Sequence, residues 1–321
     1  MEEFTLTIIG SGSALPMHGR HPSSQVLQYG EFFFMIDCGE GTQERLRSAG
    51  IKPFKIRTIL ISHLHGDHLF GLPGLLGSYA HLKRSDPLTI YGPPGIRGFL
   101  DAVMAYTEMV ITFPLQVIEL HPEGLQRLEV VEDVEILTFP LYHRIACVGY
   151  LFREIHSEPR MRKELVEGYK LTPEHIRNIR NGKDLIFSSK QIPASTFFYP
   201  PGPRVSYAYC SDTRYDDRLL SSIKGVSVLY YEATFLDDLA EMAEKTGHST
   251  AAEAGKMAAW AEVCCLLTGH YSSRYKEVSV LVDQARQYFS HVLEAVEGKK
   301  YNLRALAEIS GRAEDIKTLL K

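Results

Sequence analysis

The segment Ile59-Leu60-Ile61-Ser62-His63-Leu64-His65-Gly66-Asp67-His68 carries the strongest signal in the sequence. It reads as an apolar strand that runs directly into three imidazoles and one carboxylate. Neutral imidazole and carboxylate are the ligands that divalent metals such as zinc prefer. Four such residues within six are too many for one tetrahedral ion that also keeps an open position. The segment therefore predicts a site for two metal ions at the end of a strand.

Three later segments repeat this context. The apolar runs Leu137–His143, Tyr207–Thr213 and Cys264–His270 each end close to a possible ligand. These ligands are His143, Asp212 and His270. A lone His after a strand is more often an ordinary surface residue, but together with the first segment the three supply the ligands that two metals still need.

Composition limits the class of protein. The 321 residues carry a formal charge of −4, with 45% hydrophobic and 23% charged residues, which are values typical of a globular domain. No apolar stretch reaches the length of a membrane span, so we expect a soluble protein with no membrane partner. The five cysteines are odd in number and form no C-x-x-C, which favours a reducing, cytoplasmic compartment.

Short strand-like runs alternate with helical stretches, which predicts an α/β fold of sheets covered by helices in a single domain, 1–321. The expected strands are Thr5–Ile9, Phe32–Ile36, Thr58–Ser62, Leu88–Tyr91, Val134–Phe139, Val205–Cys210, Val226–Tyr230 and Val263–Leu267. The expected helices are Gly41–Ser48, Gly71–Leu82, Ile96–Met104, Ala251–Ala261 and Val278–Ala295.

A basic stretch interrupts this pattern. Between Arg144 and Lys183 there are nine Lys or Arg and five Glu, a local charge of +4 in an acidic chain. Strand signals are sparse there, and we interpret residues 150–200 as a flexible arm inserted into the domain. Its candidate nucleic-acid contacts are Arg160, Arg162, Lys163, Lys170, Arg177, Arg180 and Lys183. The alternative is an ordinary solvated helical excursion.

The motif H-x-H-x-D-H followed by spaced His, Asp and His resembles the metallo-β-lactamase superfamily. The resemblance implies an αββα sandwich with two Zn²⁺ ions and a hydrolytic reaction. One zinc would bind His63, His65 and His143; the other would bind Asp67, His68 and His270, with Asp212 bridging them.

Further motifs narrow the resemblance to tRNase Z, the tRNA 3′-processing endoribonucleases. They are Gly10–Ala14, Asp37-Cys38-Gly39-Glu40-Gly41-Thr42-Gln43, Pro53–Thr58, Glu232-Ala233-Thr234 and His248-Ser249-Thr250. The resemblance covers residues 5 to 280 or so. It implies cleavage of precursor tRNA just after the discriminator nucleotide, an arm that binds the tRNA elbow, and a homodimer. The arm departs from the family, because Lys170–His175 stands where relatives carry a Gly-Pro-rich turn.

Catalytic roles follow from that resemblance. Asp67 would bind the second metal and also accept the proton of the attacking water. His248, supported by Glu232, would protonate the leaving 3′-oxygen. The alternatives are a capping role for His248 at a helix start and a surface position for Glu232. For Asp37 we favour a role in shaping the loop behind the site.

Two other functions compete with this one. A small-molecule hydrolase of the same fold, acting on a lactone, thioester or sulfate ester, would need the metals but neither the basic arm nor the His248/Glu232 pair. A non-catalytic nucleic-acid-binding module would not need a full set of metal ligands, and every expected ligand is present.

Overall fold

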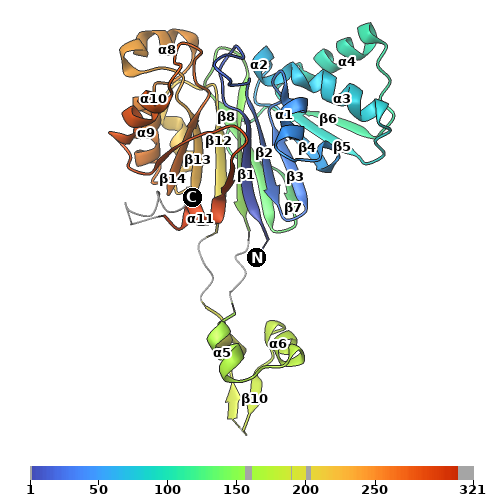
Figure 1. Ribbon diagram of the computed structural model, residues 1–321, viewed down its shortest axis with the longest axis vertical. Coiled ribbons are helices and arrows are strands. Elements are labelled where there is room, and N and C mark those ends of the chain that lie inside the picture. The colour runs from blue at the N-terminus through green and yellow to red at the C-terminus, as the bar shows by residue number, and fades with distance from the viewer. Residues whose placement is uncertain (1, 156–160, 189, 200–203, 310–321) are drawn as a thin grey trace. The chain divides into compact units, whose positions relative to one another are not determined.

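Two large mixed sheets form the body of the protein, Glu2–Arg153 and Val205–Ile309, in the computed structural model (Figure 1). The structure describes residues 2–155, 161–188, 190–199 and 204–309. A second compact unit, which we call the inserted unit, spans Glu154–Arg204.

The first sheet joins the N-terminal half of the body to one strand near its end. Its spatial order is β16 (Lys300–Asn302), β1 (Phe4–Gly10), β2 (Ser24–Tyr29), β3 (Phe32–Ile36), β4 (Ile56–Leu60), β5 (Leu88–Gly92) and β6 (Leu115–Glu119). Strands β3 to β6 are mutually parallel, and β1 pairs antiparallel with both neighbours.

The second sheet has a similar mixture. Its order is β15 (Val292–Glu294), β14 (Cys265–Gly269), β13 (Val228–Glu232), β12 (Ser206–Cys210), β9 (Cys147–Glu154), β8 (Val134–Leu141) and β7 (Gln126–Val131). Strands β12 to β15 are mutually parallel, whereas β9 pairs antiparallel with β12.

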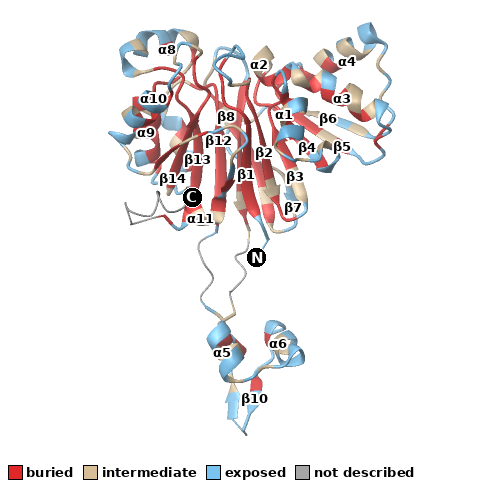
Figure 2. Cartoon of the chain, viewed as in Figure 1, coloured by how far each residue is buried: buried red, intermediate tan, exposed pale blue. Residues whose placement is uncertain are grey.

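Side chains on successive residues of a strand pack alternately into the core between the sheets and the core beneath the helices. In β13, Val228 and Tyr230 enter the core between the two sheets, while Leu229 and Tyr231 enter a second core on the outer face. This alternation is what the period of two in a strand dictates when both faces are covered. Figure 2 shows the buried residues concentrated along these strands.

Helices cover both outer faces. On the first sheet lie α1 (Thr42–Ser48), α3 (Gly71–His81) and α4 (Ile96–Thr107); on the second lie α9 (Ala251–Trp260) and α10 (Ser279–Arg286) (Figure 1). Helix α9 starts with a capping box, in which Thr250 and Glu253 satisfy each other's backbone N–H. The predicted αββα sandwich is confirmed.

Two sequence predictions were wrong. The helix expected over Val278–Ala295 ends at Arg286, and β15 follows it, because Val292–Glu294 pairs in parallel with β14. Strand signals were also missed at Cys147–Glu154, which forms β9 with seven of its eight residues buried. Tertiary pairing decides both segments, and a periodicity argument cannot detect it.

The inserted unit has a small core of its own. It contains α5 (Lys163–Gly168), α6 (Pro173–Arg180) and the hairpin β10 (Leu185–Phe187) to β11 (Lys190–Ile192). Ile179, Leu185 and Phe197 are buried together there. No helix in the described part of the chain is long and apolar enough to cross a membrane.

Candidate metal centre

The candidate ligands lie just beyond strand ends of the two sheets. His63 comes three residues after β4, Asp212 follows β12 by two residues, and His270 comes directly after β14. Their strands belong to the parallel parts of the two sheets, where carboxyl ends share an edge. His143 lies two residues past β8, and Glu232 is the last residue of β13.

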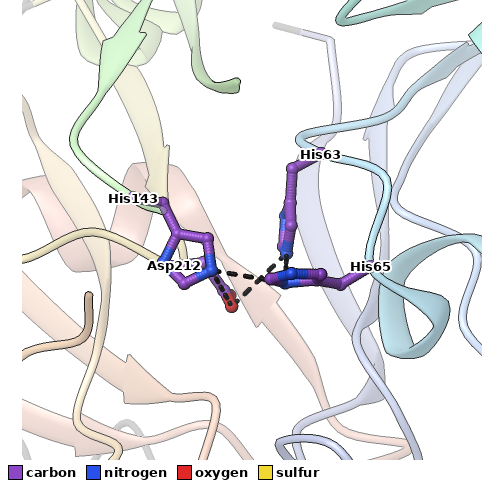
Figure 3. Close-up of side chains that lie close together, drawn as sticks. All are labelled: His63, His65, His143 and Asp212. Atoms are coloured by element: carbon purple, nitrogen blue, oxygen red, sulfur yellow. Dashed lines mark hydrogen bonds and ion pairs between the residues drawn. The ribbon is translucent and has the colours of Figure 1, made fainter. Parts of the chain in front are cut away.

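One group of ligand atoms comprises His63, His65, His143 and Asp212, all within 4.8 Å of one another. Figure 3 shows His63 and His65 approaching from one side and His143 and Asp212 from the other. His63 Nε2 lies 3.0 Å from His65 Nδ1, and His143 Nε2 lies 3.3 Å from the same atom. Ring nitrogens at these distances converge on one point.

A second group comprises Asp67, His68 and His270. His68 Nε2 and His270 Nε2 are 3.3 Å apart, and Asp67 Oδ2 lies 3.6 Å and 3.5 Å from them. Asp212 faces both groups, with one oxygen toward each. Its Oδ2 lies 3.5 Å from His63 Nε2, and its Oδ1 lies 3.1 Å from both His68 Nε2 and His270 Nε2.

Hydrogen bonds behind the histidines fix which nitrogen faces the centre. His143 Nδ1 donates to the Gly247 carbonyl at 2.6 Å, and His68 Nδ1 donates to Asp37 Oδ2 at 2.7 Å. His63 Nδ1 lies 3.0 Å from Ser62 Oγ, whose own proton goes to Asp37. The inner nitrogens of His63 and His143 therefore present lone pairs to the centre, an arrangement that a cation stabilises.

Asp37 is tied to the centre more closely than its loop position suggests. It is fully buried, and its carboxylate accepts from Ser62 N, Ser62 Oγ, His68 Nδ1 and Tyr209 OH at 2.6–2.8 Å. The interpretation of Asp37 as a loop-shaping residue missed this bond to His68. Carboxylates that hold a histidine in this way orient its ring and raise its basicity.

Burial sets the protonation of the first group. It lowers the pKa of His63, His65 and His143, so these imidazoles are neutral, as metal ligands must be. Burial raises the pKa of Asp212, but the imidazoles of His270 and His68 outweigh it and hold that pKa well below the usual range.

His248 and Glu232 form a buried pair beside Asp212. His248 Nδ1 lies 3.2 Å and 3.1 Å from the two Glu232 oxygens and 3.9 Å from Asp212 Oδ2. Glu232 also accepts from Thr213 N at 2.6 Å and from Thr234 Oγ1 at 2.5 Å. Burial lowers the pKa of His248, but the Glu232 carboxylate raises it to about 9. Glu232 is fully buried, so its alternative as a surface acid is excluded, and α9 is capped by Thr250 rather than His248.

A cavity of about 480 Å³ opens onto these groups. Its polar wall includes His65, Asp67, Asp212, His248 and His270, and its other lining residues include Leu15 and Phe70. Asp67 Oδ2 accepts a hydrogen bond from Ala14 N at 2.8 Å. Gly10–Ala14 is one of the motifs that carry the family resemblance, but it holds no signal for this particular contact. Leu15 and Phe70 were missed, because exposed apolar residues have no sequence signature of their own.

The candidate nucleic-acid residues belong to the inserted unit. Lys163, Lys170, Arg177, Arg180 and Lys183 are exposed, whereas Arg162 is half-buried with its guanidinium 5.2 Å from the Tyr199 ring centre. Arg160 lies outside the described residues.

The sandwich and the clustered His and Asp side chains define a metallo-β-lactamase-fold protein. Solved structures agree: human tRNase Z, short form, matches with a TM-score of 0.69 and 25% identity, covering 93% of this chain and 99% of that one. A metallo-β-lactamase fold protein from Bacillus subtilis matches with a TM-score of 0.67 and 18% identity, covering 93% and 99%. A family model described as anti-Pycsar protein Apyc1 matches residues 4–102.

Curated relatives identify the particular family. Ribonuclease Z of Bacteroides thetaiotaomicron is 37% identical over 298 residues, which cover 92% of this chain and 94% of that protein. Ribonuclease Z of Cytophaga hutchinsonii is 39% identical over 302 residues, covering 93% and 96%. The chain belongs to the ribonuclease Z family.

Proposed function

We propose that the protein is a metal-dependent endoribonuclease that cuts precursor tRNA after the discriminator nucleotide, removes the 3′ trailer and leaves a 3′-hydroxyl. The observation that carries this proposal is the His248–Glu232 pair beside two groups of ligand atoms in one cavity. Family membership supports the same reaction. A lactone, thioester or sulfate-ester hydrolase would have no need of that buried pair.

The donor set suits two Zn²⁺ ions. His63, His65 and His143 would hold one, Asp67, His68 and His270 the other, and Asp212 offers one oxygen to each group. Such ions make water more acidic and offset the negative charge of a phosphodiester. Imidazole nitrogen and carboxylate oxygen are both ligands that zinc binds in proteins.

The chain's own residues move the protons. A water oxygen bonds to phosphorus, the bond from phosphorus to the 3′-oxygen breaks, and that oxygen needs a proton. Glu232 occupies His248 Nδ1, which leaves Nε2 to donate the proton. Asp67 takes the proton of the attacking water, and the bond from Ala14 N holds its carboxylate in place.

Affinity for tRNA would come from the inserted unit, acting as an arm within one functional domain. Phosphate contacts supply most nucleic-acid affinity, and the exposed cations of this unit are suited to make them. A homodimer, in which an arm serves the partner's active site, is proposed from the family resemblance. A cytoplasmic setting is supported by the cysteines of the described chain, which are all free.

One experiment tests the reaction directly. The zinc-loaded protein is incubated with a 3′-extended precursor tRNA, and the new ends are mapped at single-nucleotide resolution. We expect one cut after the discriminator, abolished by a chelator and restored by zinc. If the precursor is not cut and a lactone or thioester is hydrolysed instead, the protein is a small-molecule hydrolase.

A further inference from the structure

Phe70 is an exposed aromatic residue on the wall of the metal-centre cavity. It is 63% exposed, although it follows the metal-ligand segment directly, at the end of α2 (Gly66–Leu69). Single exposed apolar residues are common on protein surfaces, and what sets this ring apart is its place on a cavity wall beside His and Asp side chains. Aromatic residues around a few polar groups are typical of a ligand-binding pocket.

The backbone next to Phe70 is closely packed against neighbouring segments. A side chain on Gly66 would collide with the Phe70 ring, so the ring lies directly against the metal-ligand loop. A side chain on Gly71 would collide with the Gly39 carbonyl, and Gly71 N donates to the Cys38 carbonyl at 2.8 Å. These contacts fix the backbone next to Phe70 and place its ring against the metal-ligand loop.

A second apolar segment of the same cavity is equally fixed. Leu15, 55% exposed, and Pro16 lie on the loop between β1 and β2. Ser13 N donates to the Tyr271 carbonyl at 3.0 Å, and the Glu297 carboxylate binds His21 N at 2.7 Å. Because this loop is tied to the C-terminal part of the body, the apolar wall is preformed.

The cavity thus combines two chemistries at close range. Its ligand-bearing wall suits a phosphodiester, and its apolar wall offers a flat ring and an aliphatic side chain. At about 480 Å³ it falls within the roughly 300–1,000 Å³ of small-ligand sites, which admits nucleotides next to the cut but not folded RNA. Nucleobases stack on exposed aromatic rings regardless of sequence.

We infer that Phe70, with Leu15, forms a stacking subsite for a nucleobase adjacent to the scissile phosphate. This inference rests on the proposed function. The base belongs either to the discriminator nucleotide or to the first trailer nucleotide, and both offer the same π-face. Stacking there would position the phosphodiester over the metal centre independently of the inserted unit.

The test compares the zinc-loaded wild type with Phe70→Ala, Phe70→Leu and Phe70→Trp. Each protein is assayed on three substrates: an intact precursor tRNA, one that is abasic at the discriminator and one that is abasic at the first trailer nucleotide. Tyr106→Ala in α4 is the matched control, because Tyr106 is 92% exposed and does not line the cavity. Single-turnover kcat/KM and zinc content are measured for each protein.

We expect Phe70→Ala to lower kcat/KM on the intact substrate by roughly 5- to 150-fold, the range reported for one stacked base. Phe70→Trp should retain wild-type activity, whereas Phe70→Leu should lose it as Phe70→Ala does. The zinc content of all three variants should equal that of the wild type. On one of the two abasic substrates, the wild type and Phe70→Ala should have the same kcat/KM. The base missing from that substrate is the stacked one.

Three results would overturn the inference: an effect of the same size on all three substrates, rescue by Leu as good as by Trp, or a loss shared by Tyr106→Ala. Failure of the wild type to cut the intact precursor would instead overturn the proposed function, so the two failures are distinguishable.

Discussion

The metal centre and the inserted unit present their polar side chains in opposite ways. At the centre, His63, His68 and Asp212 are buried and each makes several polar contacts. In the inserted unit, Arg177 and Lys183 are exposed. Buried polar groups lose much when one partner is removed, whereas exposed charges contribute small, similar amounts. We therefore expect chemistry to depend on a few positions and recognition to be shared among many.

The largest effect is expected from His63→Ala. Removing this nitrogen opens the group of His63, His65, His143 and Asp212, so zinc and all turnover should be lost together. We expect a loss of at least about 10⁴-fold out of the 10⁶–10¹⁷-fold accelerations typical of enzymes. Zinc content and cleavage of both precursor tRNA and bis(p-nitrophenyl) phosphate are measured. His121→Ala, an exposed histidine of the body, is the control, and full activity of His63→Ala would refute the site.

His248→Ala should separate two substrates that differ in their leaving group. On precursor tRNA we expect a loss of about 10²–10⁴-fold, as for other general acids. Bis(p-nitrophenyl) phosphate releases a phenolate that needs no proton, so its turnover should change far less. Glu232→Gln, which keeps a hydrogen-bond partner for His248 but removes the charge, should give an intermediate loss on tRNA. Equal losses on both substrates would remove His248 as the general acid.

Removing the inserted unit tests whether recognition is separate from chemistry. Glu154 and Val205 continue the antiparallel register of β9 and β12, in which Arg153 is opposite Ser206, so an Asn-Gly turn can replace residues 155–204. We expect KM for precursor tRNA to rise at least tenfold, about 1.4 kcal/mol of binding, while turnover of bis(p-nitrophenyl) phosphate is unchanged. Equal losses on the two substrates in a folded variant would show that the inserted unit maintains the structure of the metal centre rather than binding tRNA.

The sequence predicts the clustering at the centre well because each candidate side chain stands next to a strand end. His143, Asp212 and His270 could be grouped with His63 for that reason alone. Their roles as ligands stay predictions. The backbone of the site could not be predicted in the same way. Asp37, Asp212 and His270 adopt left-handed backbone with φ between 54° and 59°, which non-glycine residues rarely do.

Contacts between segments far apart in the chain could not be predicted from the sequence either. The bond from Ala14 N to Asp67 uses a backbone donor, which every residue except proline has. The bond from His21 N to the Glu297 carboxylate joins residues 276 apart in the chain. Neither leaves a pattern in one sequence. The strand at Val292–Glu294 was mistaken for helix for the same reason, because only pairing with β14 makes it a strand.

The smallest effect is expected from a single charge in the inserted unit. Arg177 lies in the last turn of α6 and is exposed, so one phosphate contact is the most it can supply. Arg177→Ala should weaken precursor binding slightly and reduce the slope of log affinity against log salt by about 1. Lys224→Ala in the body, where Lys224 pairs with Glu262 at 3.3 Å, should leave the slope unchanged. An unchanged slope for Arg177→Ala would exclude Arg177 from the phosphate contacts, and a loss of turnover on bis(p-nitrophenyl) phosphate would contradict the separation of recognition from chemistry.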